Sequence, residues 1–155
     1  IKNRLLSFFD SETGTHNFQS DKAIDSITSG GFFGKGIGEG TLKNRVPEAH
    51  TDYIISVISE EFGVIAIILI FLLFLIFIYS VFKKVNFEND ETIKLILVGS
   101  ISLILMQTII HIGVNIRLFP TTGMTLPFIS YGGSSIISIS IISGIILNFT
   151  KRNLN

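Results

Sequence analysis

The chain has 155 residues, of which 47% are hydrophobic and 15% are charged, and its formal net charge is zero. About a quarter of the residues of an ordinary soluble domain are charged, so this composition excludes that class and favours a membrane protein. The neutral balance gives no reason to expect nucleic acid as a partner, and the lack of cysteine excludes disulfides and thiolate metal sites within this chain. Because the chain begins at Ile1 without a signal-peptide pattern, we expect a carboxy-terminal part of a longer protein.

Residues 1–57 are polar and mixed, and we expect them to form an extracytoplasmic loop. Within them, residues 18–29 predict an amphipathic helix that lies on the membrane, with an apolar side made of Phe18, Ala23, Ile24 and Ile27. Residues 30–40 contain six glycines in eleven positions. Such a segment is either a flexible linker or a backbone that a ligand approaches closely, and glycine content does not decide between them. The segment does not fit the Walker pattern of nucleotide-binding loops.

A dense polar cluster follows the glycine-rich segment. Pro47 suits the first turn of a helix, so we expect a helix to begin there. Residues that recur every four positions would share one face of this helix, namely Glu48, Asp52, Ser56 and Glu60. The helix dipole favours acidic residues at a helix start, but a carboxylate directly beside an apolar run needs a cavity or a partner. We therefore favour a functional site over a simple acidic helix start. His50 and Asp52 point in different directions on a helix, so their spacing does not indicate a metal site.

Three apolar stretches predict membrane-spanning helices, at about residues 58–82, 94–116 and 129–149. The first stretch is uncharged from residue 62 to residue 82 and apolar on all sides. At about 1.5 Å per residue this length crosses a hydrocarbon layer of roughly 30 Å. We therefore expect an all-α, multi-pass integral membrane protein, in which residues 58–155 form a domain of three transmembrane helices.

The distribution of lysine and arginine near the spans predicts the orientation. The loop of residues 83–94 and the carboxy terminus carry basic residues, so both are expected in the cytoplasm; these residues are Lys83, Lys84, Lys94, Lys151 and Arg152. Residues 1–57 and 117–128 then lie outside. The basic residues of the long outer loop carry little weight in this rule and are candidates to meet an anionic ligand.

The last outer loop, residues 117–135, contains two prolines and three glycines and is expected to be re-entrant-like. Irregular backbone at membrane depth is tolerated where it packs against protein or lines a wet cavity. The run from Gly132 to Ser135 would open the third helix with free N–H groups, either as an anion site or as a plain helix cap. His111 and Asn115 lie one helical turn apart in the second span, and we favour polar packing over a direct role for them.

Two long motifs resemble those of a known family. Residues 30–63 read GGFFGKGIGEGTLKNRVPEAHTDYIISVISEEFG, and residues 120–135 read PTTGMTLPFISYGGSS. They are similar to motifs of the SEDS family of shape, elongation, division and sporulation proteins, and closer to its division (FtsW) branch than to its elongation (RodA) branch. The resemblance covers nearly the whole chain. It departs mildly at Tyr53 and Ile55, where the family motif usually reads HTDFIF, and in the SEE run before Phe62, where the family has a small residue more often.

This resemblance implies a peptidoglycan glycosyltransferase of the bacterial cytoplasmic (inner) membrane, a helical bundle of ten spans of which this chain would supply the last three. Its substrate would be lipid II, a disaccharide-pentapeptide on undecaprenyl pyrophosphate. The implied partners are a class B penicillin-binding protein transpeptidase, other division proteins and membrane lipids. The family's catalytic aspartate falls on Asp52. Candidates for substrate binding are Glu48, His50, Thr51, Glu60, Lys35, Lys43, Arg45, Arg117, Ser130, Gly132, Gly133 and Ser134.

The source of positive charge and the activity itself both remain open from the sequence. The cations could offset charge on a leaving pyrophosphate, as could a divalent cation, Mg²⁺ or Mn²⁺, held by carboxylates. A lipid II flippase would suit the same residues as a polymerase. A truncated, inactive remnant is the third reading, and we expect the segment alone to lack activity because the family's cavity needs both halves.

Overall fold

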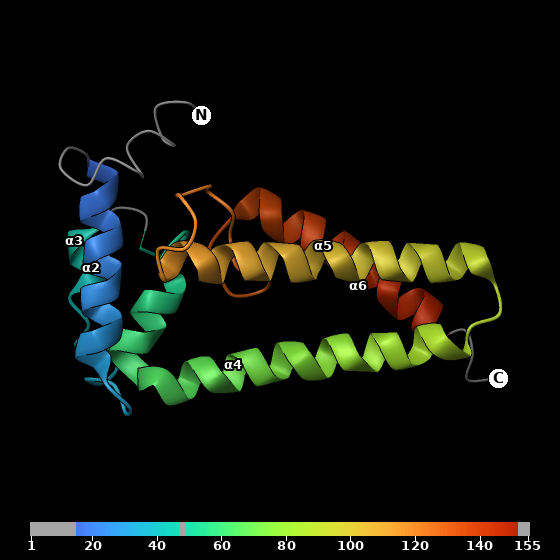
Figure 1. The fold of residues 1–155 in the computed structure, drawn as a ribbon, viewed down its shortest axis with the longest axis horizontal. Helices are drawn as coiled ribbons and strands as arrows, with labels where there is room; N and C mark the ends of the chain where they lie inside the picture. Colours follow the sequence, from blue (N-terminus) through green and yellow to red (C-terminus); the bar gives the residue numbers. More distant parts are fainter. Residues whose placement is uncertain (1–14, 47–48, 152–155) are drawn as a thin grey trace.

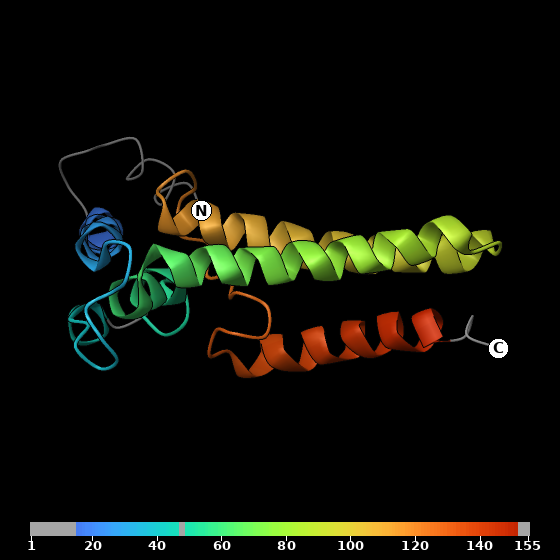
Figure 2. The same ribbon diagram turned by 90° about the horizontal axis from the view of Figure 1, so that it is seen from below.

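The computed structural model describes residues 15–46 and 49–151, and all regular secondary structure in that part of the chain is helical. Three long helices lie lengthwise beside one another, and a shorter helix crosses one end of them (Figures 1 and 2). The helices are α2 (Thr15–Gly30), α3 (Leu42–Arg45), α4 (Ile54–Phe87), α5 (Glu91–Asn115) and α6 (Gly133–Lys151).

The predicted all-α membrane architecture is confirmed, because α4, α5 and α6 are each long and apolar enough to cross a membrane. The bounds of all three helices differ from the expected ones by a few residues, and two of these differences matter for the fold. α4 continues to Phe87, so Lys83 and Lys84 lie inside the helix instead of ending it. α6 begins at Gly133 and not near residue 129, because the chain first makes a turn in which the N–H groups of Ile129 and Ser130 both donate to the carbonyl of Leu126.

The first span is not one straight helix, contrary to the expectation. Gly63 has φ +80° and ψ 177°, which breaks the helical path inside α4. Figure 1 shows the resulting bend between the short teal-green start of α4 and its long green remainder. A residue with this backbone conformation cannot continue the hydrogen bonds of a helix, so carbonyl and N–H groups on both sides of the break need other partners.

The glycine-rich segment supplies those partners. The N–H groups of Lys35 and Gly36 donate to the carbonyls of Glu60 and Glu61, at 2.9 and 3.1 Å. In return, the N–H of Val64 donates to the carbonyl of Gly31, at 3.0 Å. The segment is therefore a main-chain clip on α4, which neither of the two sequence interpretations anticipated.

Close approach explains why the clip needs glycine. A Cβ atom on Gly34 would lie 2.2 Å from the carbonyl oxygen of Glu61, and one on Gly63 would lie 2.1 Å from that of Phe32. Real Cβ atoms do not approach backbone oxygens this closely. Both glycines also have positive φ, which side-chain-bearing residues rarely adopt. The two segments can touch only where both lack side chains.

α2 is the predicted amphipathic helix, but the side that faces the protein consists of small residues. Ala23, Ser26 and Gly30 are buried, whereas Ile24 and Ile27 are only half-buried; the side chain of Phe18 lies outside the described part. A Cβ on Gly30 would lie 2.1 Å from the carbonyl oxygen of Ser59, so α2 and the start of α4 are in backbone contact. A small buried cluster joins α2, α3, the turn before α4, the start of α4 and the end of α5. It comprises Ala23, Leu42, Val46, Ala49, Tyr53, Val57 and Val114.

Candidate active site

The acidic motif does not form the expected continuous helix. Pro47 and Glu48 lie outside the described residues, and residues 49–53 form turns, so α4 begins only at Ile54. The prediction that Asp52 shares a helical face with Ser56 and Glu60 is therefore wrong, because Asp52 precedes the helix. The long-range hydrogen bonds of this turn, which a single sequence does not reveal, hold the main chain in a non-helical path.

The carbonyls of three successive residues are tied to other parts of the molecule. The N–H of Tyr131 donates to the carbonyl of His50 at 3.1 Å. The hydroxyl of Ser130 donates to the carbonyl of Thr51 at 2.8 Å, and the side-chain amide of Asn115 donates to that of Asp52 at 2.9 Å. The turn that carries Asp52 is thus clamped between the end of α5 and the turn before α6.

Exposure differs sharply along this clamped turn. The side chain of His50 is exposed and Thr51 is half-buried, whereas Asp52 is only 8% exposed and Tyr53 is fully buried. Ser130, another predicted binding residue, is buried, and its hydroxyl also accepts from the N–H of Leu126 at 2.8 Å. Ser130 therefore has a structural use at this site, beside any contact with a substrate.

His111 and Asn115 have the polar packing role that we favoured for them. The Nε2 atom of His111 lies 3.3 Å from the carbonyl of Thr51, one residue before the carbonyl that Asn115 contacts. Both side chains are at most 1% exposed. A buried polar side chain in an apolar span requires a partner, and here the partner is the main chain beside Asp52.

Glu60 faces a polar pocket at the junction of α2, α3 and α4. Its carboxylate accepts hydrogen bonds from the ammonium group of Lys35 at 3.0 Å, the hydroxyl of Thr41 at 3.1 Å and the N–H of Leu42 at 3.0 Å. Because all three bonds are donated to Glu60 and one comes from a cation, the arrangement suits an ionised carboxylate. This explains how a charge is tolerated beside an apolar run, and it gives Glu60 a role in joining α3 and the clip to α4.

The cationic side chains predicted to bind a ligand differ in whether they form ion pairs within the protein. Lys35 is paired with Glu60, and Arg117, at positive φ just after α5, forms an ion pair with Asp21 of α2. Arg45 is exposed, lines the same polar cavity of about 230 Å³ as Glu60, and makes no ion pair within residues 15–46 and 49–151. The side chain of Lys43 lies outside the described part.

The beginning of α6 lines a second, larger cavity between α5 and α6, of about 590 Å³. Gly132 and Ser134 lie on its wall, and Gly133 opens the helix. Near its polar end the amide of Gln107 donates to the carbonyl of Thr125 at 2.9 Å, and the hydroxyl of Thr125 donates to that of Ser135 at 2.6 Å. The cavity wall thus brings the predicted residues Gly132 and Ser134 together with two side chains, Gln107 and Thr125, that were not among the predicted site residues.

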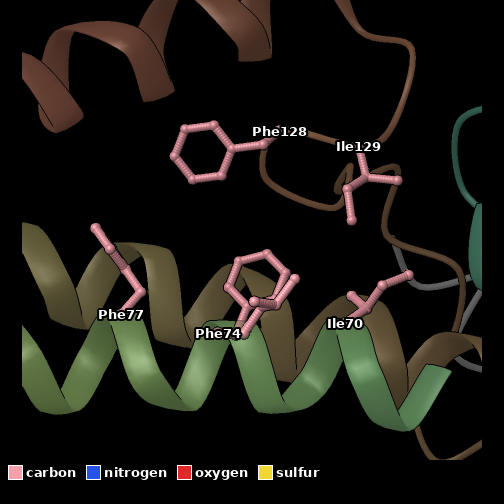
Figure 3. Close-up of a pocket in the computed structure, with 6 residues that line it drawn as sticks. Ile70, Phe74, Phe77, Phe128 and Ile129 are labelled. Carbon is pink, nitrogen blue, oxygen red and sulfur yellow. The ribbon is translucent and has the colours of Figure 1, made fainter. Parts of the chain in front are cut away.

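Apolar cavities lie deeper along α4. One of about 300 Å³ separates Ile70, Phe74 and Phe77 of α4 from Phe128 and Ile129 of the facing turn, as Figure 3 shows. A second, of about 280 Å³, is lined by Ile55 and Leu126 among other apolar residues. Since Ile55 follows Asp52 by three positions, apolar space begins close to the clamped turn.

The described residues contain no group of three His, Asp or Glu side chains that could hold a metal ion. Asn115 and Thr41 were not among the predicted site residues, although Asn115 binds the carbonyl of Asp52 and Thr41 binds Glu60. The available signal was the isolation of His111 and Asn115 in an otherwise apolar span, since such residues need a specific partner. The residues next to Glu60 in the sequence did not indicate its partners, because Lys35, Thr41 and Leu42 lie about 20 positions earlier in the chain.

Comparison with known proteins decides the family. A family model described as cell cycle protein, which covers FtsW, RodA and SpoVE, matches residues 2–155. The chain belongs to the SEDS family. Within it, the chain is 39% identical over 141 residues to the probable peptidoglycan glycosyltransferase FtsW of Caulobacter vibrioides, and 42% identical over 138 residues to that of Enterococcus hirae. These matches place it in the division-type FtsW branch.

The chain spans about a third of the length of these SEDS relatives. The matches cover 91% of the chain but 36% of the Caulobacter protein, and 88% of the chain but 35% of the Enterococcus protein. A solved structure described as "Structural coordination of polymerization and crosslinking by a peptidoglycan synthase complex" has the same fold, with a TM-score of 0.75 over 99% of this chain and 42% of that one, at 24% identity.

Proposed function

We propose that the intact protein is a peptidoglycan glycosyltransferase that polymerises lipid II during cell division, and that this segment supplies the general base, Asp52. The relatives are named probable peptidoglycan glycosyltransferases. The observation that carries the assignment is a buried carboxylate in a turn whose three successive carbonyls are fixed by α5 and the turn before α6. A fixed base suits catalysis, because orientation before reaction removes entropy from the barrier.

In the proposed step, Asp52 takes the proton from the 4-hydroxyl of an N-acetylglucosamine while that oxygen forms a bond to the anomeric carbon of a second lipid II. The bond from this carbon to the pyrophosphate oxygen breaks, and undecaprenyl pyrophosphate leaves with the bonding electrons. A single displacement of this kind inverts the configuration at the carbon. General base catalysis typically contributes about 10²- to 10⁴-fold in rate.

The leaving pyrophosphate needs positive charge nearby. Arg45 is our candidate, because Lys35 and Arg117 are already used in ion pairs and Arg45 lines a polar cavity. For the polyprenyl chain, the apolar cavities along α4 are suitable in chemistry, since their walls consist almost wholly of apolar side chains. Glu48, His50, Thr51, Lys43, Gly132, Gly133 and Ser134 remain candidates for binding the sugar and peptide portions.

We further propose that the protein acts at the division site of the bacterial cytoplasmic membrane with a class B penicillin-binding protein. A divalent cation, Mg²⁺ or Mn²⁺, would offset charge on the leaving pyrophosphate if the intact protein binds one. Chelation with EDTA followed by addition of either ion tests it: restored polymerisation supports a metal requirement, and polymerisation unchanged by EDTA contradicts it.

The deciding experiment compares polymerisation of lipid II by the intact protein, reconstituted with its penicillin-binding partner, for the wild type and Asp52→Asn. Asp90→Asn is the matched control, because it makes the same chemical change at the N-cap of α5 and asparagine still accepts from Thr92. Glycan strands from the wild type and the control but not from folded Asp52→Asn support the proposal.

Three other results would contradict it. Equal strands from all three proteins would remove Asp52 from catalysis. No strands from any of them, together with transport of lipid II across vesicles by the wild type, would favour a flippase. The absence of both activities would identify an inactive remnant.

A further inference from the structure

The side chain of Asn115 bridges the two sides of the turn that carries Asp52. Its amide nitrogen donates to the carbonyl of Asp52 at 2.9 Å and to that of His111 in its own helix, also at 2.9 Å. Its amide oxygen accepts from the hydroxyl of Ser56 at 2.8 Å and from the N–H of Ser56 at 3.2 Å. Asn115 and Ser56 are both fully buried, so water does not compete for these bonds.

This contact replaces a missing helix cap. The N-cap residue of α4 is Tyr53, whose side chain makes no capping hydrogen bond. A cap normally accepts from the second or third N–H of the helix, and Ser56 occupies that third position. Asn115 therefore caps α4 from a different helix. The nitrogen of the same side-chain amide binds the carbonyl of Asp52, the residue just before the N-cap residue Tyr53.

We propose that Asn115 is a positioning residue that fixes the Asp52 carboxylate relative to α4 and α5. This inference rests on the proposed function, because it assumes that Asp52 is the base. The competing explanation is that Asn115 only holds the two helices together. The two explanations differ in what the donor half of the amide does: positioning needs the bond to the Asp52 carbonyl, whereas capping needs only the oxygen.

Asn115→Asp separates them. Aspartate keeps the size and the acceptor for Ser56 but loses the N–H that binds the Asp52 carbonyl. In the intact protein with its partner we expect kcat for lipid II polymerisation to fall by about 10- to 100-fold, because a displacement of about 1 Å can cost about 10²-fold in rate. KM for lipid II should stay close to the wild type, whereas the thermal unfolding midpoint in detergent should fall, because a buried carboxyl oxygen would face the carbonyls of Asp52 and His111 in place of the N–H donors. Asn115→Ala should lower kcat similarly and also lower the unfolding midpoint.

Two controls calibrate the loss. Ser143→Ala removes a half-buried polar group from α6, but the hydroxyl of Ser143 donates only to the carbonyl of Ile139 in its own helix at 2.7 Å, so kcat should be retained. Ser56→Ala removes the hydroxyl bond but keeps the N–H bond to Asn115, so kcat should fall by no more than a few-fold.

The outcomes are distinct from those of the proposed function. Wild-type kcat in both Asn115 variants, with Asp52→Asn inactive, overturns the positioning role and leaves the function in place. An equal loss in Ser143→Ala, or failure of both Asn115 variants to fold, assigns Asn115 to stability and also overturns it. Full activity of Asp52→Asn would instead contradict the proposed function itself.

Discussion

Two constraints require glycine at position 63, its positive φ and its close contact with the backbone of the clip. Its φ of +80° lies in the left-handed region, and a Cβ there would lie 2.1 Å from the carbonyl oxygen of Phe32 and 2.6 Å from the nitrogen of Gly34. Both groups belong to the clip and are backbone atoms, so they cannot move aside as a flexible side chain can. Gly63 is thus where the glycine-rich segment and the first span specify each other.

We expect Gly63→Ala to lower the free energy of unfolding by about 2 kcal/mol or more, since positive φ alone costs about 1–2 kcal/mol and the overlap adds to it. Gly99→Ala is the matched control, because Gly99 lies within α5 and a Cβ there has nothing within 4 Å. It should be neutral or stabilising by up to about 1 kcal/mol. Thermal unfolding in detergent measures both, and equal stability of the two variants would refute the clip.

The contribution of the buried ion pair between Glu60 and Lys35 to stability can be measured by substitution. Glu60→Gln leaves Lys35 without its partner and weakens three hydrogen bonds at a site that is 1% exposed, so we expect a loss of about 1–3 kcal/mol. Glu91→Gln removes an ion pair with Lys94 in which the carboxylate is 80% exposed, and it should cost about 0.5 kcal/mol or less. Similar losses in chemical denaturation would show that burial of Glu60 has no energetic consequence.

The elements were predictable to different degrees, for physical reasons. Hydropathy predicted three spans because lipid requires long, apolar helices, and residue pattern predicted α2. The break at Gly63 was not predictable, since one glycine in an apolar run is also common in unbroken spans. The same holds for the start of α4: Pro47 is a good helix opener, but the carbonyls of residues 50–52 are held by groups about 60 to 80 positions away.

For the candidate site, the residue types were predictable but their use was not. Asp52 and Ser130 were both singled out, yet only the structure brings Ser130 to the turn of Asp52. Glu60 was expected to face a cavity or a partner and has both. Its partner Lys35 had been considered for a ligand, because a lone sequence shows the charge of a lysine and not what it neutralises.

The connection between α5 and α6 acts as an element that braces the Asp52 turn. Ser130→Ala removes the bond to the Thr51 carbonyl and the acceptor for the Leu126 N–H. We expect faster hydrogen exchange at residues 126–131 and a loss of about 1–2 kcal/mol. Ser138→Ala is the control, because that exposed hydroxyl donates only to the carbonyl of Ser134 in its own helix. Unchanged exchange in Ser130→Ala would exclude the brace.

On the scale of the whole molecule, polar segments lie at the two ends of the long axis and apolar helix surfaces lie between them. α2, the Asp52 turn and the connection before α6 gather at one end, while the α4–α5 connection and the end of α6 lie at the other (Figure 1). The second end carries Lys83, Lys84, Lys94 and Lys151. The long helices expose many large apolar side chains between the two ends, among them Ile68, Leu69, Leu72 and Leu103, as expected for surfaces that meet lipid or further helices.

This separation predicts the orientation in the membrane. Basic residues near span ends favour the cytoplasm, so the α4–α5 connection should be inside and the Asp52 turn outside. The chain has no cysteine, so in the intact protein, with any cysteine outside this chain replaced by serine, a single cysteine placed here reports one side. In Thr122→Cys, at an exposed position before α6, a membrane-impermeant maleimide should label intact spheroplasts; in Asn89→Cys, exposed between α4 and α5, it should label only after permeabilisation. The reverse pattern would place Asp52 in the cytoplasm. There it could not polymerise strands outside the cell, so the proposed function would fail together with the orientation.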